Sequence, residues 1–386
     1  MTDKKPSASE FWDQSLWDGT VPRHYWTNNP LSNAYANFMM TDDFKYQNSI
    51  QWFGERYLSR FHKLPAAKGV SIGCGTGIAE RQSLEAGLCH RMDGFDFSPA
   101  SLEKARRRAQ EAGLESRLRY ELKDLNRERL PEESYEFALS FGCLHHIEKL
   151  EHLLSTIHDS LKRDGLFYFN EYVGPPRFQW PREIVDMINH LINLLPSRCL
   201  KTGHYRPIAE KDLADPSEAI RSDEIMAIGR QYFEFLDGRY YGGALLFPLW
   251  GEVIWPEIFL DPSLEEYQSI LKLLLLLDEF WTRNLEGSFV QVVACRKDAP
   301  RDLIQEGLRI ATNAPKHPIG EWLRAAPGKK GKEGKGGNIL LSMGLEAANA
   351  FYKTMFVLKN QDLRTLGWKF KWFLRERIDK YRSKKR

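Results

Sequence analysis

The stretch at residues 69–82, GVSIGCGTGIAERQ, decides the fold of this chain. A short apolar run is followed there by three glycines on alternate positions, Gly73, Gly75 and Gly77, and then by a helical pattern. In an open parallel sheet, a glycine turn after the first strand brings backbone N–H groups and a helix N-terminus against a ligand. The stretch therefore predicts the first strand of such a sheet, with a ligand-binding turn at its end.

Apolar strand patterns and charged helix patterns alternate downstream of this turn. Strands are predicted at 69–73, 90–98, 118–125, 135–144, 166–174 and 288–297. Helical patterns follow the first, second and fourth of these strands. This alternation predicts an α/β fold, with a Rossmann-like, doubly wound, mostly parallel sheet of seven strands.

The rest of the chain is divided by changes in composition. The predicted segments are an aromatic-rich segment at 1–52, a core at 53–174, a helical lid or substrate region at 175–286, a closing strand at 287–297, a linker at 298–337 and a basic amphipathic helix at 338–386. The helical lid is expected to cover a site built by the core.

Composition indicates a globular protein without a disulfide framework. The chain has 386 residues, of which 42% are hydrophobic and 28% are charged. Its first residues lack the apolar run of a secretory signal, so a cytoplasmic protein is expected. The five cysteines are scattered and form no Cys-x-x-Cys pair, which favours buried, reduced thiols over disulfides or a zinc site.

The C-terminal region differs from the rest in charge. Residues 329–386 contain 16 Lys or Arg and 5 Asp or Glu, a net charge of +11 that leaves −8 for the remainder. Apolar residues recur at helical spacing between Leu363 and Tyr381, with cations around them, which predicts peripheral contact with an anionic inner membrane surface. Docking on its own domain or on a second subunit of a homodimer is the alternative, and nucleic acid is disfavoured because the acidic body offers no continuing groove.

The glycine turn and Asp96 together predict a nucleoside site. Asp96 ends the predicted second strand, 23 residues after Gly73, where a carboxylate can accept hydrogen bonds from two ribose hydroxyls. A dinucleotide site needs G-x-G-x-x-G for its pyrophosphate, whereas residues 73–77 read GCGTG. The ligand is therefore expected to carry a ribose without a pyrophosphate.

Four segments in order resemble the motifs of the class I S-adenosylmethionine-dependent methyltransferases. These segments are VSIGCGTG, GFDFSPASLEKAR, LKDLN and YEFALSFGCLHHIEKLEHLL, between residues 70 and 154. The resemblance implies S-adenosyl-L-methionine as cofactor. It assigns the cofactor contacts to Gly73, Cys74, Gly75 and Gly77 at the methionine portion, Asp96 at the ribose, Phe97 beside the adenine, Asp124 and Leu125 at the adenine edge, and Phe141 nearby.

A narrower resemblance concerns the acceptor. FNEYVGPPRFQWP and DPSEAIRS are similar to signatures of a bacterial branch of this family, of which several members are associated with polysaccharide or O-antigen assembly. Polar groups and flat aromatic faces in and beyond these segments predict substrate contacts at Tyr172, Arg177, Gln179, Trp180, Glu218, Arg221, Tyr240 and Tyr241. Structural ion pairs and lid core packing are the alternative for the same residues.

Three residues at strand ends are candidates for acid–base chemistry. A hydroxyl acceptor needs a general base, and His145, His146 and Glu171 follow the fourth strand or end the fifth. We expect the base to be His146 or Glu171. A metal site is not expected, because His145 and His146 are adjacent and His152 and His158 fall on later turns of the following helix.

The sequence thus predicts an enzyme that transfers a methyl group from S-adenosyl-L-methionine to a small-molecule or glycan acceptor, such as a sugar hydroxyl in polysaccharide biosynthesis. N- or C-methylation of a non-sugar metabolite is an alternative acceptor chemistry. A catalytically silent recruiting module and a nicotinamide oxidoreductase are the rival classes.

Overall fold

The computed structural model describes residues 7–14, 25–43, 45–46, 48–261, 264–285 and 287–312. The predicted basic helix at 338–386, with its expected membrane contact, lies outside these residues, as does the linker beyond residue 312. Within the described ranges, no helix is both long enough and apolar enough to cross a bilayer.

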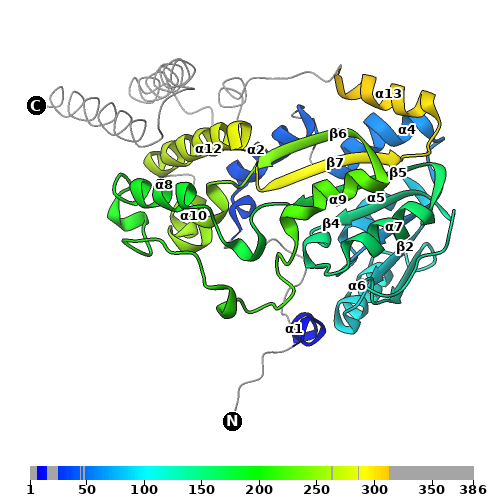
Figure 1. The fold of residues 1–386 in the computed structure, drawn as a ribbon, viewed down its shortest axis with the longest axis horizontal. Helices are drawn as coiled ribbons and strands as arrows, with labels where there is room; N and C mark the ends of the chain where they lie inside the picture. The colour runs from blue at the N-terminus through cyan, green and yellow to red at the C-terminus, as the bar shows by residue number, and fades with distance from the viewer. Residues whose placement is uncertain are drawn as a thin grey trace, which may run out of the picture.

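The core is a seven-stranded sheet in the order β3-β2-β1-β4-β5-β7-β6, as Figure 1 shows. Its strands are β1 (Ala66–Ile72), β2 (Cys89–Asp96), β3 (Leu118–Leu122), β4 (Tyr135–Phe141), β5 (Leu161–Tyr172), β6 (Phe233–Gly242) and β7 (Phe289–Arg296). Only β7 runs antiparallel to its two neighbours. The predicted doubly wound, mostly parallel fold is therefore confirmed.

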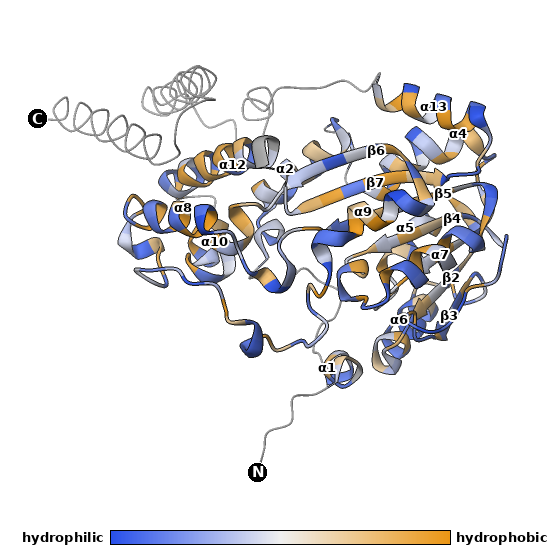
Figure 2. Ribbon diagram, viewed as in Figure 1, coloured by the Kyte–Doolittle hydropathy of each residue, from blue (hydrophilic) through white to orange (hydrophobic). Residues whose placement is uncertain are grey.

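Helices cover both faces of the sheet, and each face has its own apolar core. The elements on one face include α3 (Ser49–Phe53), the π-helical turn η2 (Gly54–Leu58), α4 (Ser59–Phe61), α5 (Ile78–Glu85), α6 (Pro99–Glu111) and α13 (Arg301–Thr312). On the other face lie α7 (Leu150–Ser160) and α9 (Ile225–Tyr232). Because both faces are covered, six of the seven residues of the central strand β4, YEFALSF, are buried, without alternation between buried and exposed positions; Figure 2 colours the strands by hydropathy.

A helical layer adjoins the carboxyl ends of β5 and β6. It consists of η1 (Trp26–Asn28), α2 (Pro30–Thr41), α8 (Arg182–Ile192), α10 (Leu246–Glu252), α11 (Pro256–Leu260) and α12 (Glu265–Leu285), which share a third apolar core. The buried carboxylate of Asp278 on α12 accepts hydrogen bonds from the N–H groups of Gly243, Leu245 and Leu246. These bonds cap α10 and fix the helical layer to the end of β6.

The structure corrects two predicted segments. The region 175–286 is not purely a helical lid, because it contributes β6, which pairs with β7 at the edge of the sheet. The segment 298–337 is not a linker from its start, because residues 301–312 form α13. Leu303 of this helix is buried, and Gly307 lies against Leu236 of β6, so an amphipathic helix covers the last strand of the sheet.

The buried carboxyl group of Glu80 gives a test of this packing. Glu80 lies on the inner side of α5 with 0% of its surface exposed, and burial raises its pKa from 4.5 to about 7, against a smaller opposing effect of Ser71. The folded state thus favours the protonated form of Glu80. The contribution of Glu80 to stability is therefore most favourable below about pH 4.5 and becomes less favourable as the pH rises to about 7.

We expect Glu80→Gln to raise the free energy of unfolding by up to about 3 kcal/mol at pH 8, with a much smaller change at pH 5. Urea unfolding at the two pH values measures the difference. The exposed Glu85 lies on the same helix, and Glu85→Gln is the matched control, without the pH-dependent gain. An equal effect of Glu80→Gln at both pH values would contradict the argument.

Candidate active site

The glycine turn leaves β1 with its backbone in the left-handed region. Gly73, Gly75 and Gly77 have φ values of 64°, 51° and 74°. A Cβ on Gly73 would lie 2.3 Å from the Sγ atom of Cys143, so a side chain cannot be accommodated there. Cys74 follows Gly73, and its N–H donates to the carbonyl of Phe95 at the end of β2 (3.0 Å). The turn is therefore bare backbone held between β1 and β2.

Asp96 is joined directly to this turn. Its carboxylate accepts hydrogen bonds from the N–H of Gly75 (2.8 Å) and from the N–H of Ser98 (2.9 Å). Burial raises the pKa of Asp96, although these backbone bonds oppose the shift. Each carboxylate oxygen keeps a second lone pair that can accept a further hydrogen bond. The arrangement is compatible with a ligand that carries neighbouring hydroxyls.

The other predicted cofactor residues lie along the same edge of the sheet. The N–H of Lys123 donates to the carbonyl of Asp96 (2.8 Å), which places Asp124 just beyond the ends of β2 and β3. The Asp124 carboxylate accepts from the N–H of Asn126 (3.0 Å) and pairs with Arg127. Leu125 is buried, while Phe97 is half-buried.

Phe141 ends β4 and packs edge-to-face on Tyr168, with 5.4 Å between the ring centroids. The strand order places β4 beside β1, so Phe141 lies one strand away from the glycine turn. The predicted cofactor residues thus follow the ends of four adjacent strands, β3, β2, β1 and β4.

Glu171 organises the turn that follows β4. It is 1% exposed, and its Oε1 atom accepts hydrogen bonds from the N–H groups of Cys143 (2.7 Å) and Leu144 (2.8 Å). The Nδ1–H of His145 donates to Oε2 (2.8 Å). Because these donors occupy both oxygens in a buried place, Glu171 is suited to holding His145 in position and not to accepting a proton from a substrate.

His145 is buried between two carboxylates. Its Nε2 atom lies 3.4 Å from Oε1 of Glu218, on the side opposite to Glu171. Burial alone would lower the pKa of His145, but the two carboxylates outweigh this effect and raise the pKa to about 10. Burial would raise the pKa of Glu218, but the neighbouring His146 and His145 lower it to about 2.

A second series of side-chain hydrogen bonds orients His146. Ser217 donates its hydroxyl proton to Oδ1 of the buried Asp215 (2.6 Å), so the Ser217 oxygen accepts the Nδ1–H of His146 (3.1 Å). The Nε2 atom of His146 is then the nitrogen with a lone pair. Burial and the positive charge of His145 lower the pKa of His146, which keeps it neutral near pH 7.

Three predicted substrate residues lie beside this histidine pair. Glu218 faces His145, and the ring of Tyr172 lies edge-to-face at 6.2 Å from the His145 ring. The guanidinium of Arg177 donates to the carbonyls of Pro216 (2.8 Å) and Glu218 (3.1 Å). Arg177 therefore holds the segment that carries Asp215, Ser217 and Glu218.

The other predicted substrate residues have structural contacts. Arg221 pairs with Glu151 and Glu224 on the surface, and Gln179 donates to the backbone carbonyls of Arg177 and Ile208. Trp180 and Tyr241 are buried in the core of the helical layer, and Tyr240 packs against the core beneath α7 and α9. For these predicted residues the geometry favours the structural alternative over substrate contact.

The N-terminal helix α1 (Ala8–Gln14) contributes contacts that the sequence did not reveal. Asp13 accepts hydrogen bonds from the hydroxyl of Ser98 (2.8 Å) and the N–H of Ala100 (3.3 Å) at the start of α6. The ring of Trp12 lies edge-to-face on His146, with 5.4 Å between centroids. Helix α1 therefore contacts both the start of α6, just after Asp96, and the histidine pair, and Figure 1 shows it beside α6. The local sequence gives no signal for it, because both contacts are with residues far away along the chain.

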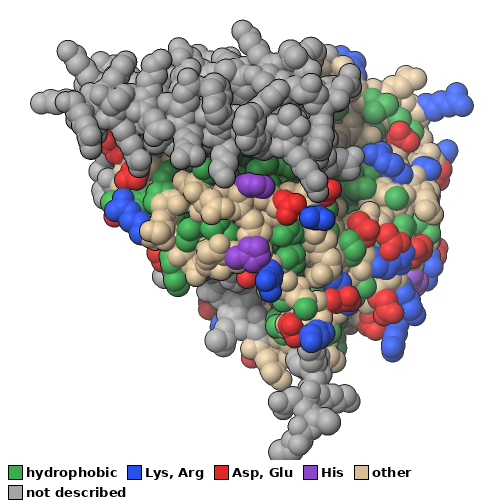
Figure 3. All heavy atoms as spheres, turned by 60° about the vertical axis from the view of Figure 1, so that its left-hand side comes forward, with side chains coloured by type: hydrophobic (Ala, Val, Ile, Leu, Met, Phe, Trp, Pro, Cys, Tyr) green, Lys and Arg blue, Asp and Glu red, His purple; other side chains and the backbone are tan. Residues whose placement is uncertain are grey.

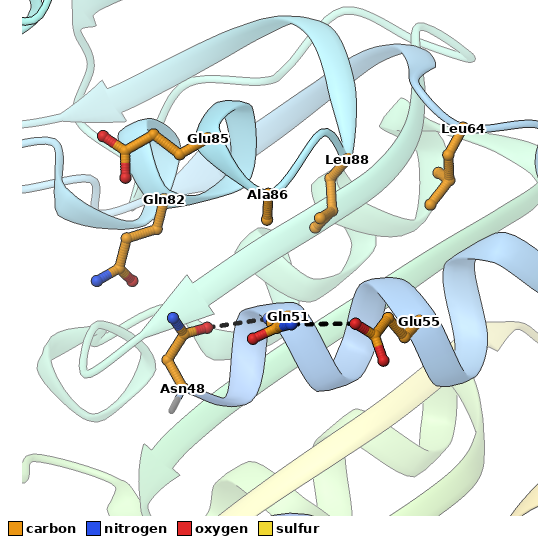
Figure 4. A pocket seen from close by; sticks show the side chains of 8 residues that line it. All are labelled: Asn48, Gln51, Glu55, Leu64, Gln82, Glu85, Ala86 and Leu88. Carbon is orange, nitrogen blue, oxygen red and sulfur yellow. Dashed lines mark hydrogen bonds between the residues drawn. The ribbon is translucent and has the colours of Figure 1, made fainter. Parts of the chain in front are cut away.

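A pocket of about 240 Å³ lies away from these groups. Its lining includes Asn48 and Gln51 at the start of α3, Gln82 and Glu85 of α5, and Leu88 just before β2 (Figure 4). Leu88 and Leu64 precede β2 and β1, so the pocket belongs to the amino edge of the sheet. Ligands of open parallel sheets bind at the opposite, carboxyl edge, where the predicted residues converge.

We expect Glu171→Gln to lower the pKa of His145 by about one unit or more from its value near 10, because one of the two carboxylates that offset the effect of burial is removed. The stabilisation from protonated His145 is complete below pH 6.5 and is lost as the pH rises towards about 10, so the loss of stability in the variant should be largest below about pH 6.5 and should shrink as the pH rises. NMR titration of the imidazole protons measures the pKa. Glu151→Gln, on the surface, is the control, and an unchanged His145 pKa in Glu171→Gln would refute this role.

Comparison with solved structures gives related folds at low identity. The geranyl diphosphate C-methyltransferase of Streptomyces coelicolor, crystallised with Mg²⁺, geranyl diphosphate and S-adenosyl-L-homocysteine, is 16% identical, with 75% of this chain and 96% of that chain covered at a TM-score of 0.44. An S-adenosylmethionine-dependent methyltransferase of Mesorhizobium loti is 22% identical, with 64% and 98% covered at a TM-score of 0.37.

Sequence comparison finds partial relatives and a domain family. An uncharacterized protein of Haemophilus influenzae is 36% identical over 117 residues, which span 30% of this chain and 45% of that protein. The squalestatin tetraketide synthase of a Phoma species is 28% identical over 135 residues, only 5% of its length. Residues 70–167 match the family described as methyltransferase domain. This range contains the glycine turn, Asp96 and the histidine pair.

Proposed function

We propose that this protein is an S-adenosyl-L-methionine-dependent methyltransferase. The observation that carries the proposal is the hydrogen bond from the Gly75 N–H to the Asp96 carboxylate. This bond holds a bare backbone turn beside a carboxylate that can accept hydrogen bonds from ribose hydroxyls. The match of residues 70–167 to a methyltransferase domain supports the same conclusion. A nicotinamide dinucleotide fits less well, because the turn lacks the glycine pattern that a pyrophosphate requires.

The residues present fit this cofactor. Gly73, Gly75 and Gly77 would allow close backbone approach to its methionine portion, and Asp96 would accept its ribose hydroxyls. When bound, S-adenosyl-L-methionine supplies a methyl group on a positively charged sulfur, which becomes a neutral thioether after transfer. The protein must then align the acceptor with the methyl carbon and exclude water, and such positioning can lower a barrier by roughly 7–11 kcal/mol.

The acceptor is proposed to present a hydroxyl at the histidine pair. A hydroxyl that gains a methyl group must lose its proton, and the neutral His146, with a lone pair on Nε2, is suited to accept it. Glu171 acts by holding His145 and not as the base. A sugar or glycan hydroxyl in polysaccharide assembly is the acceptor that the similarity of the FNEYVGPPRFQWP and DPSEAIRS segments supports.

The described surface also favours a small or glycan-like acceptor over a polyanion. On the face drawn in Figure 3, acidic and basic side chains of the described residues lie intermingled. A nucleic acid would require a continuous basic groove to neutralise its phosphates.

Calorimetric titration with S-adenosyl-L-homocysteine tests the cofactor. We expect one site per chain, with an affinity about 10–100-fold weaker in Asp96→Asn because hydrogen bonds to a charged acceptor are lost. NADH should give no heat. Glu103→Gln, exposed on α6, is the control. A folded wild-type protein that binds NADH but not S-adenosyl-L-homocysteine would refute the proposal.

Turnover with a panel of sugar, glycan and non-sugar acceptors tests the acceptor chemistry. We expect His146→Ala to lower kcat by about 10²-fold or more, with unchanged affinity for S-adenosyl-L-homocysteine. His152→Ala, on the surface of α7, is the matched control. Near-normal turnover of His146→Ala at saturating acceptor would exclude a role of His146 in activating the hydroxyl.

A further inference from the structure

The nitrogen atoms of the histidine pair are arranged as metal ligands are. Glu171 takes the Nδ1–H of His145, and Ser217 takes the Nδ1–H of His146, because its own proton is donated to Asp215. In each neutral ring, Nε2 is therefore the atom with an available lone pair. Buried carboxylates and hydroxyls that fix the far nitrogen of a histidine are typical of the surroundings of metal-binding imidazoles.

Glu218 supplies a third donor. One ring nitrogen of each histidine and one carboxylate oxygen of Glu218 lie within 4.8 Å of one another, the one such group found among the described residues. The distance from His145 Nε2 to Glu218 Oε1 is 3.4 Å, which is longer than an ordinary N–H···O hydrogen bond of about 2.7–3.2 Å. Ligand atoms of a tetrahedral ion with bonds of about 2.0–2.1 Å lie about 3.3 Å apart, close to this distance.

The charges around the pair favour a divalent cation. The carboxylates of Glu171, Asp215 and Glu218 are 0%, 4% and 20% exposed at their side chains. Arg177, which bonds the backbone of this segment, is the fixed cation beside them. Two negative charges remain, and the protonation of His145 compensates only one of them. A divalent ion in place of that proton would compensate both.

We propose that His145, His146 and Glu218 bind one divalent transition-metal ion, of which Zn²⁺ is the type case. Two imidazoles and one carboxylate are a donor set that such ions accept, and three protein ligands leave a coordination position open. The three donor atoms lie within 4.8 Å of one another, so binding requires separations in the group to shrink by up to about 1.5 Å, and Glu218 is the most exposed of the three side chains. Glu171 and Ser217 are then the groups that orient the two imidazoles.

The consequence for catalysis rests on the proposed function. An acceptor hydroxyl bound at the open position would have a lowered pKa and would release its proton to solvent water, so that no protein base is required. In the ion-loaded protein, the lone pair of His146 is a ligand, whereas in the ion-free protein it is available as a base. The metal site itself is defined by geometry and charge and does not depend on methyl transfer.

Metal binding to the full chain tests the proposal directly. Protein freed of metal with EDTA and dialysed is titrated with Zn²⁺ by calorimetry and with Co²⁺ by visible absorption. We expect one Zn²⁺ per chain and Co²⁺ absorption bands of a site with nitrogen and oxygen ligands. Glu218→Gln and His146→Asn should each weaken Zn²⁺ binding by about tenfold or more, and the pair together should abolish it.

His190→Ala is the matched control, because His190 is exposed on α8 and its ring bonds the backbone carbonyl of Asp186 (2.7 Å). Circular dichroism and binding of S-adenosyl-L-homocysteine show whether each variant is folded. Equal Zn²⁺ binding by wild type and the double variant, or no stoichiometric binding by the wild type, would overturn the proposal. Zn²⁺ binding without S-adenosyl-L-homocysteine binding would instead refute the proposed function and leave the metal site standing.

Discussion

The carboxylate of Glu171 is the interaction on which the candidate site depends. It lies at the end of β5 with almost no exposed surface, so its charge must be balanced by donors within the protein. The N–H groups of Cys143 and Leu144 and the ring of His145 provide this balance. One buried group thereby fixes the path of the chain after β4 and the orientation of the first histidine.

The turn after β4 connects the part of the candidate site around Asp96 with the part around the histidine pair. Cys143, whose N–H bonds Glu171, also has its sulfur against Gly73, so the position of the glycine turn depends on the path after β4. On one side of this contact are Asp96 and the bare backbone, and on the other are the imidazoles and Glu218. A nucleoside and an acceptor could therefore meet at one edge of the sheet, although their contacts come from segments far apart in the sequence.

The nucleoside half could be predicted from the sequence, and much of the acceptor half could not. Gly73 and Asp96 follow consecutive strands, so strand order alone brings them together. Glu218 and Arg177 were predicted from their chemical type, and they do lie at the histidine pair, but Arg221, of the same type, forms a surface ion pair instead. Chemical type indicates what a side chain can bind, whereas its location is set by the packing of the inserted region.

The sequence by itself determined six of the seven strands, the glycine turn and the burial of the five cysteines, because these follow from local hydrophobic patterns and from backbone conformations that only glycine adopts readily. Only the tertiary structure decided that β6 and α13 complete the fold, that Glu171 bonds the ring of His145, and that Asp215, Ser217 and Trp12 lie near His146. The physical reason is that the orientation of a buried polar group is set by the hydrogen-bonding groups around it. Those donors come from distant segments that meet only when the chain is folded.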